Sequence, residues 1–316
     1  MLNSFTSSFN RYTVRFFLAQ GTVLLALFGA TVVLVRDYIE PHDRVVKSLE
    51  LIQQETAADA AFGDSHLAWG FVGSPEFPTL GAEGETVRDM ELRVRYYYRN
   101  KQPGKVVVQG DPHSYAVYKM DRGTHDYLDN MDNQFWQRFL EHHRPYMGKY
   151  WQRVIERRGF DVFRPADEMR WGWIAGHEQW SSRDSSVRVG LSRAREVWQR
   201  PDSGFRDGES AQAYKRTLEY LRGRGADVCV VTTPVSYEYY QYAKDDSVTA
   251  AALNYVRRVA EQTGARYFNY FDLFAQPEFT NYFRDMDHLN EIGAPRFTRR
   301  VLSDCFGGPT VGAAGQ

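Results

Sequence analysis

Three residues near opposite ends of the chain could perform nucleophilic catalysis together. Gly63-Asp64-Ser65 follows a run of small apolar residues, and a strand ending this way presents its serine at the carboxyl edge of a sheet. Asp285 and His288 stand three residues apart near the other end. A serine hydroxyl needs a base to take its proton, and the imidazole needs a carboxylate to fix its tautomer. The pattern predicts Ser65 as nucleophile, His288 as general base and Asp285 as orienting carboxylate.

Asp287 is a second carboxylate that could compete for the same role. It directly precedes His288, where its side chain should point elsewhere, whereas three residues of separation let the chain turn back and bring Asp285 to the imidazole. Each motif alone could also have a purely structural role. Gly, Asp and Ser are common in turns and helix caps, and a lone histidine is often a buried residue whose hydrogen bonds are satisfied. Only the combination favours catalysis.

The segments that must position these groups alternate between short valine-rich runs and helical stretches. Such alternation predicts an α/β fold whose parallel sheet is covered on both faces. Strands are expected at 57–62, 105–109, 227–233 and 265–269, and helices at 87–98, 211–224, 248–263 and 297–302.

Between about residues 119 and 210 the alternation stops and the sequence becomes aromatic and basic. No valine-rich strand occurs there, so we interpret the segment as a helical insertion. Its Trp and Tyr side chains could stack on sugar rings at the mouth of a site. They could equally pack onto the core as a helical cap, and the sequence leaves both interpretations open.

A membrane anchor is predicted near the N-terminus. Phe16 to Val35 is an uncharged run of roughly 20 residues, which matches a hydrocarbon thickness of about 30 Å. Arg11 and Arg15 precede this run, and positive charge favours the cytoplasmic side. The remaining chain should then face the periplasm. A cleaved signal peptide is the rival interpretation, although its apolar region is usually shorter and no convincing cleavage site is visible.

The predicted organisation is one main domain with additions. The parts are a cytoplasmic tail at 1–15, a single-pass transmembrane signal anchor in the cytoplasmic (inner) membrane at 16–36, a stalk helix at 37–55, the catalytic domain at 56–306 with its insertion at about 119–210, and a disordered tail at 307–316.

Composition excludes several classes of function. The 316 residues carry a net charge of −1 without a basic stripe, so nucleic acid is not an expected partner. Cys229 lies in an apolar run and Cys305 near the C-terminus, and we expect two inert thiols rather than a disulfide. Neither a metal-binding His or Cys spacing nor a glycine-rich phosphate loop is present, so no metal or nucleotide cofactor is expected.

From Ala57 to Cys305 the sequence resembles the SGNH (GDSL-like) hydrolase superfamily, with Gly63-Asp64-Ser65 as its first block and Asp285-x-x-His288 as its last. The surroundings FGDSHLAWGF, KVVVQGDPHSY and DMDHLNEIGAPRFT are similar to the membrane-anchored extracytoplasmic branch. That branch includes the alginate O-acetylation proteins and the lipoteichoic acid D-alanylation protein. The resemblance implies a three-layer, flavodoxin-like domain that works with a membrane-bound O-acyltransferase on an exported polysaccharide or wall polymer.

The resemblance also implies an oxyanion hole. The backbone N–H of Ser65 would be one donor and that of a glycine the second, for which Gly84 is expected and Gly81 is the competitor. The usual asparagine of the third block is absent, since the chain reads Gly110-Asp111-Pro112-His113-Ser114. His113 could replace it as a donor or be an ordinary turn residue. His66, beside the nucleophile, is expected to be a pocket-wall or helix-start residue.

Three functions remain open at this level. The leading hypothesis is an O-acyltransferase, with acetyl as the expected group, that passes through a Ser65 acyl-enzyme. A membrane-tethered esterase would use the same three residues. A non-catalytic assembly subunit that binds a glycan or an acyltransferase is the third.

Overall fold

We describe a computed structural model of the chain over residues 3–120, 135–157, 159 and 169–307. The chain forms two compact units, each described by itself. The first contains Met1–Asp43 and Asn133–Pro165, and the second contains Arg44–Asp132 and Ala166–Gln316. The predicted disordered tail beyond Gly307 and parts of the predicted insertion, 121–134 and 160–168, lie outside the described residues.

The second unit is built on a four-stranded parallel sheet with the order β1-β2-β5-β6. Its strands are β1 Ala60–Phe62, β2 Lys105–Gln109, β5 Asp227–Val231 and β6 Arg266–Phe268. The predicted α/β class and all four predicted strands are confirmed. Apart from the exposed first residues of β2 and β5, the strands β1, β2 and β5 are buried on both faces, so apolar runs rather than alternating patterns mark them in the sequence, whereas the edge strand β6 is partly exposed.

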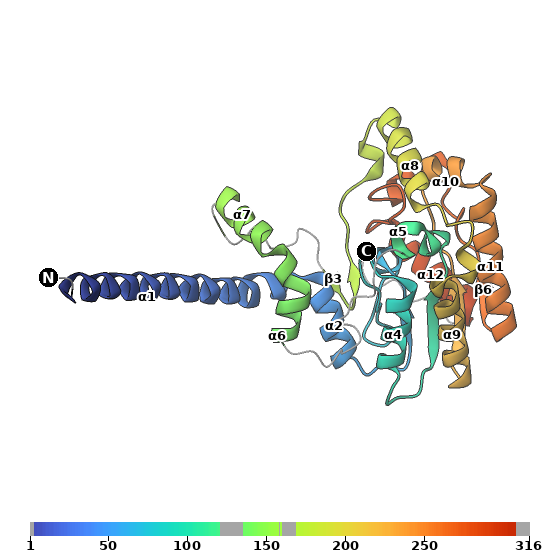
Figure 1. Ribbon diagram of the computed structural model, residues 1–316. Helices are drawn as coiled ribbons and strands as arrows, with labels where there is room; N and C mark the ends of the chain where they lie inside the picture. The colour runs from blue at the N-terminus through green and yellow to red at the C-terminus, as the bar shows by residue number, and fades with distance from the viewer. Residues whose placement is uncertain (1–2, 121–134, 158, 160–168, 308–316) are drawn as a thin grey trace. The chain divides into compact units, whose positions relative to one another are not determined.

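Side chains that alternate along the strands separate the core into two layers, one on each face of the sheet. The helices that pack on the sheet are α3 Ser65–Gly70, α4 Val87–Tyr97, α9 Glu209–Gly223, α11 Ser247–Thr263 and α12 Gly293–Phe306. Phe62, Val108 and Val230 point to one face, where α4, α9 and α11 pack. Ala61, Val107 and Cys229 point to the other, together with residues of α3 and α12. Helices therefore cover both faces (Figure 1).

The expectation of two free thiols was wrong, because Cys229 and Cys305 form a disulfide. Successive side chains of a strand point to opposite faces of the sheet, and Cys229 points to the face that α12 covers. Cys305 lies in the last turn of that helix. Their Cα atoms lie 5.8 Å apart, within the usual range for a bridge. The bond ties the C-terminal helix to a central strand.

Part of the predicted stalk belongs to the core of the second unit. Helix α2 Arg44–Gln54 buries Leu49 and Ile52 in the same layer as α4. The hydroxyl of Ser48 donates to the Gly81 carbonyl oxygen and accepts from Arg93. This helix therefore packs on the domain instead of standing clear of it as a spacer.

The described residues of the predicted insertion divide between the two units. In the second unit they form the small antiparallel pair β3 Met169–Arg170 and β4 Trp173–Ile174, the turn η8 Trp180–Ser182, and helix α8 Ser185–Gln199. The remaining short elements of this unit are η3 Pro112–Tyr115, α5 Val117–Met120, η9 Phe205–Asp207, α10 Tyr237–Ala243 and η10 Pro277–Tyr282.

The first unit consists of a long helix and a shorter helical segment. The long part is α1 Asn3–Val33, continued by the turns η1 Leu34–Ile39 and η2 Glu40–His42. Tyr12–His42 is long and apolar enough to cross a membrane, judged by length and composition. The shorter segment comprises α6 Phe135–Arg138, η5 Phe139–His143, η6 Arg144–Tyr146 and α7 Met147–Arg157.

Candidate active site

Ser65 begins helix α3 directly beyond the carboxyl end of β1. Asp64 caps this helix, since its carboxylate accepts from the backbone N–H of His66 at 3.0 Å. Gly63 is required here because a Cβ would lie 2.2 Å from the Gln109 side-chain oxygen. That same oxygen accepts from the backbone N–H of Asp64 at 2.8 Å. A side chain of the neighbouring strand thus holds the turn that presents the serine.

The three residues expected to cooperate lie in hydrogen-bonding contact. His288 Nε2 lies 3.0 Å from Ser65 Oγ, and its Nδ1 lies 2.9 and 3.1 Å from the two oxygens of Asp285. The Asp285 carboxylate also accepts from the backbone N–H groups of Asp287 and His288. This is the turned-back chain that the three-residue spacing predicts.

The surroundings of His288 favour its charged form. Burial opposes the charge, but the carboxylates of Asp285 and Asp287 outweigh it and raise the pKa of His288 to about 10. A catalytic imidazole flanked by carboxylates is stabilised as the imidazolium that forms when it takes the serine proton.

The expectation that the Asp287 side chain points away from the imidazole was wrong. Asp287 Oδ1 lies 3.2 Å from His288 Nδ1, so two carboxylates face the same nitrogen. Asp287 Oδ2 accepts from Arg195 at 2.8 Å and from Gln199 at 2.7 Å, both on helix α8, and lies 3.2 Å from His66 Nε2. Although burial favours the neutral acid, His288 and His66 hold the pKa of Asp287 well below its usual value.

Behind the serine, buried histidines and carboxylates from different segments of the chain form one network. His66 places Nδ1 3.2 Å from Asp111 and Nε2 3.2 Å from Asp287, so both ring nitrogens face carboxylates. This is the arrangement of a protonated imidazole. Burial lowers the pKa of His66, but Asp111 and Asp287 reverse the effect and raise it. The His66 ring also packs 4.6 Å from that of His288.

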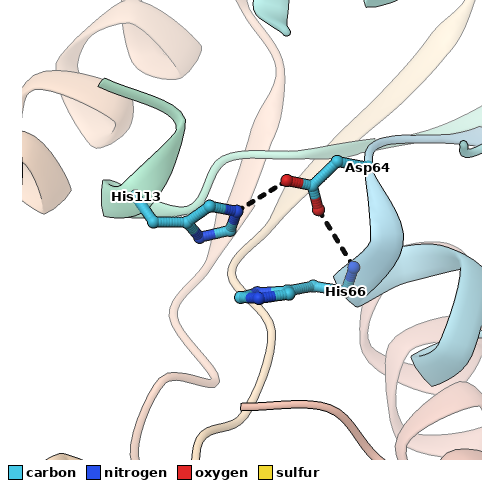
Figure 2. Close-up of side chains that lie close together, drawn as sticks. All are labelled: Asp64, His66 and His113. Carbon is cyan, nitrogen blue, oxygen red and sulfur yellow. Dashed lines mark hydrogen bonds and ion pairs between the residues drawn. The ribbon is translucent and has the colours of Figure 1, made fainter. Parts of the chain in front are cut away.

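Asp64 joins two histidines of this network, as Figure 2 shows. Its Oδ2 lies 2.6 Å from His113 Nε2 and accepts from Lys119 at 2.9 Å. The rings of His66 and His113 lie 4.0 Å apart. Burial and the neighbouring His66 lower the pKa of His113. His66 is therefore both a helix-start residue and part of a charged network.

The structure does not bring His113 to the serine. The pocket of about 240 Å³ around Ser65 is lined by other residues, whereas His113 lines a separate small cavity of about 10 Å³ with His66 and Asp111. Its position after β2 turns the imidazole toward Asp64, and that carboxylate engages Nε2. We therefore do not retain His113 as an oxyanion donor.

The structure contains two groups of side chains that could hold a metal ion by their geometry, and the spacing of these residues in the sequence did not reveal them. Among the described residues, Asp64, His66 and His113 form one such group, and His66, Asp287 and His288 the other. Hydrogen bonds within the protein already join these ligand atoms, and the Lys119 ammonium occupies one side of Asp64. These contacts explain the clusters as ion-pair networks.

The two candidate oxyanion glycines have different surroundings. Gly84 has φ +75°, a left-handed conformation that favours glycine, and it lines the pocket with Ser65 and His288. Gly81 lies against the serine turn, where a Cβ would approach the Gly63 carbonyl oxygen to 2.7 Å. Gly84 thus faces the pocket, whereas Gly81 allows two backbone segments to meet.

The pocket is lined by charged and aromatic side chains that the sequence analysis did not single out. They are Arg44, Trp69, Glu83 and Arg284. Trp69 lies one helical turn after Ser65, a spacing that could have predicted its place on the same face. The guanidinium carbon of Arg284 lies 3.6 Å from the centre of the Trp69 ring, and that of Arg44 lies 5.0 Å away. Arg44 had been assigned to the stalk.

Comparison with known proteins covers part of the chain. No curated protein matches it. Residues 205–301, less than half of the chain, match the family model described as DltD protein. The matched stretch contains Asp285 and His288 and begins after Ser65, and in it the chain is similar to that SGNH-like family.

Proposed function

We propose that this protein is an extracytoplasmic O-acyltransferase that modifies an exported polysaccharide or envelope polymer through a Ser65 acyl-enzyme. One observation carries the proposal. His288 lies between Ser65 and Asp285, with its two ring nitrogens 3.0 Å from the hydroxyl and 2.9 Å from the carboxylate. This is the geometry that a serine nucleophile needs.

The proposed reaction has two steps. Ser65 Oγ bonds to the acyl carbon of the donor while His288 Nε2 takes the hydroxyl proton, and the leaving group then departs with that proton. An acceptor hydroxyl next attacks the acyl-enzyme, gives its proton to Nε2, and Ser65 Oγ is released and reprotonated. Backbone N–H groups of Ser65 and of the loop at Gly84 would stabilise each oxyanion, at about 3–4 kcal/mol per donor.

The proposed location outside the cytoplasm has two supports. The apolar Tyr12–His42 helix fits a single-pass membrane anchor. The Cys229–Cys305 disulfide suits an oxidising compartment such as the periplasm. With Arg11 and Arg15 on the short side, the anchor would leave the N-terminus in the cytoplasm. A membrane-bound O-acyltransferase would then deliver the acyl group to the outer side.

Acetyl is the acyl group proposed from the sequence resemblance, and D-alanyl is the one that the matched family would imply. The test is to incubate the purified full-length protein with acetyl and D-alanyl thioesters and to measure the intact mass. We expect one acyl adduct on the wild type and none on Ser65→Ala. Ser182→Ala, which changes an exposed serine in η8, is the matched control and should label fully.

Adding an acceptor oligosaccharide separates the competing functions. Faster loss of the adduct with an acylated sugar as product supports the transferase. Loss to water at the same rate with or without the sugar would identify the tethered esterase. An adduct on Ser65→Ala equal to that of the wild type would refute the nucleophile, and no adduct on either protein would favour the assembly subunit.

A further inference from the structure

We propose that residues 135–157 form an interfacial segment that lies in the outer leaflet of the membrane beside the anchor helix. The segment comprises the helices α6 and α7 and the turns between them. The proposal goes beyond acyl transfer, and it rests on the proposed role of Tyr12–His42 as the membrane anchor. It concerns only the first unit of the structure.

The segment packs against the last turns of the anchor. In Figure 1, α6 and α7 lie beside the C-terminal part of α1. The Phe28 ring stacks on Trp136 with centroids 6.4 Å apart and meets Phe139 edge-on at 6.0 Å. The Trp151 indole N–H donates to Thr31 Oγ1 at 3.1 Å. Phe139 is buried with Leu34, Val35 and Ile39, and residues of α7 pack against the same cluster.

An ion pair fixes the segment where the anchor ends. Arg138 binds the carboxylate of Glu40 through two hydrogen bonds of 2.7 and 2.9 Å. His143 Nε2 lies 3.5 Å from the same carboxylate. Because a two-point Arg–carboxylate contact restricts both position and orientation, α6 is held at the boundary between the apolar run and the polar chain that follows.

The contacts set the depth of the segment in a membrane. At 1.5 Å of rise per residue, Phe28 lies about 10 Å and Thr31 about 6 Å before Val35, where the apolar run ends. Aromatic rings that contact Phe28 and Thr31 must therefore reach these depths. Interfacial helices bury their apolar faces by about 5–10 Å, and Trp and Tyr collect at this level.

The outward-facing side chains of the segment fit lipid. Trp136, Leu140 and Ile155 are 53%, 53% and 72% exposed in the protein alone. The following exposed side chains are basic: Arg144, Lys149, Arg153 and Arg157. Apolar side chains at the depth of acyl chains, with basic groups that can reach lipid phosphates, are the pattern of an interfacial helix. Continuity with the anchor makes the bilayer the occupant that we propose.

The two faces of α7 allow a matched test. The chain contains two cysteines, both in the disulfide, so an introduced cysteine can be labelled alone without reductant. Leu140→Cys, in η5, and Ile155→Cys, in α7, would report the apolar side of the segment. Lys149→Cys, on the polar side of the same helix as Ile155, is the control, and Leu25→Cys reports the anchor. Each full-length variant carries an environment-sensitive fluorophore in vesicles of phosphatidylethanolamine and phosphatidylglycerol.

Nitroxides on lipid acyl chains should quench the labels at 140 and 155 at least about twofold more strongly than the label at 149. An aqueous paramagnetic quencher should show the reverse order. Equal aqueous quenching at all three positions would overturn the proposal, and protection from both quenchers would do so by pointing to a covering protein. Failure to quench the label at 25 would refute the anchor itself, a result that leaves the Ser65 labelling test unaffected.

Discussion

Replacing each of the two carboxylates that face His288 by asparagine should separate their roles. Asparagine at 285 can still accept from the backbone N–H groups of Asp287 and His288, so the turn should persist. The carbonyl oxygen that keeps these bonds also lies 2.9 Å from Nδ1, and the amide NH2 would take the place of Oδ2 at 3.1 Å, where a donor facing Nδ1 favours the wrong imidazole tautomer. The charge of Asp287, whose Oδ1 lies 3.2 Å from Nδ1, remains beside the imidazole and can offset part of the loss.

The expected magnitude follows from this division of contacts. Losing the only orienting carboxylate costs roughly 10⁴-fold in turnover in a comparable triad, which corresponds to about 5.4 kcal/mol at 1.36 kcal/mol per tenfold. Asp285 makes the shorter, two-oxygen contact, whereas Arg195 and Gln199 hold the other oxygen of Asp287. We therefore expect losses of about 10³-fold for Asp285→Asn, about 10-fold for Asp287→Asn, and about 10⁴-fold for the double variant.

The assay is hydrolysis of a chromogenic acetyl ester, with kcat expressed per active site titrated by a serine-reactive phosphonate. Thermal unfolding is the control, because Asp287→Asn removes the buried carboxylate that pairs with Arg195 and one of the two carboxylates that face His66, and should lower stability. A larger loss in Asp287→Asn than in Asp285→Asn would reverse the assignment. Equal losses of only a few-fold in all variants would mean that neither carboxylate orients the histidine.

The remaining predictions concern pH, the disulfide and the two glycines. Because the folded pKa of His288 is about 10, kcat/KM of the free enzyme should rise with pH through an acid limb near 10, and a limb near the ordinary value of about 6.5 would contradict the environment described. The paired imidazolium should stabilise the fold fully below about pH 6.5, and this contribution should be lost as pH rises through about 10. Reducing the disulfide, which spans 76 residues, should lower the free energy of unfolding by about 4 kcal/mol in denaturant titrations, and an unchanged midpoint would count against it. Gly81→Ala should mainly reduce thermal stability, since its Cβ would meet the Gly63 carbonyl oxygen. Gly84→Ala should lower the free energy of unfolding by about 1–2 kcal/mol, because of its left-handed backbone, and should also lower turnover per folded molecule. The opposite pattern would favour Gly81 as the pocket glycine.

The sheet was predictable because its signals are local. Lys105–Gln109 was predicted to the residue, and the helices α4, α9 and α11 begin and end within two residues of their predicted limits. A strand buried on both faces must be apolar throughout, and this composition is visible without any knowledge of its neighbours. Helix α8 was not distinguished within the insertion, and its place at the site depends on Arg195 and Gln199, whose contacts with the distant Asp287 leave no local signal in the sequence.

By itself, the sequence determined the α/β pattern, the apolar N-terminal helix, and the pairing of Asp285 with His288, since each depends on residues close together in the chain. Tertiary structure alone decided which distant groups meet. It joined Cys229 to Cys305, turned Asp287 toward His288 and Arg195, and directed His113 to Asp64 instead of the serine. Strand order and the packing of helices on the sheet set these contacts, because side chains that are far apart in sequence converge only once the strands and helices that carry them are packed together.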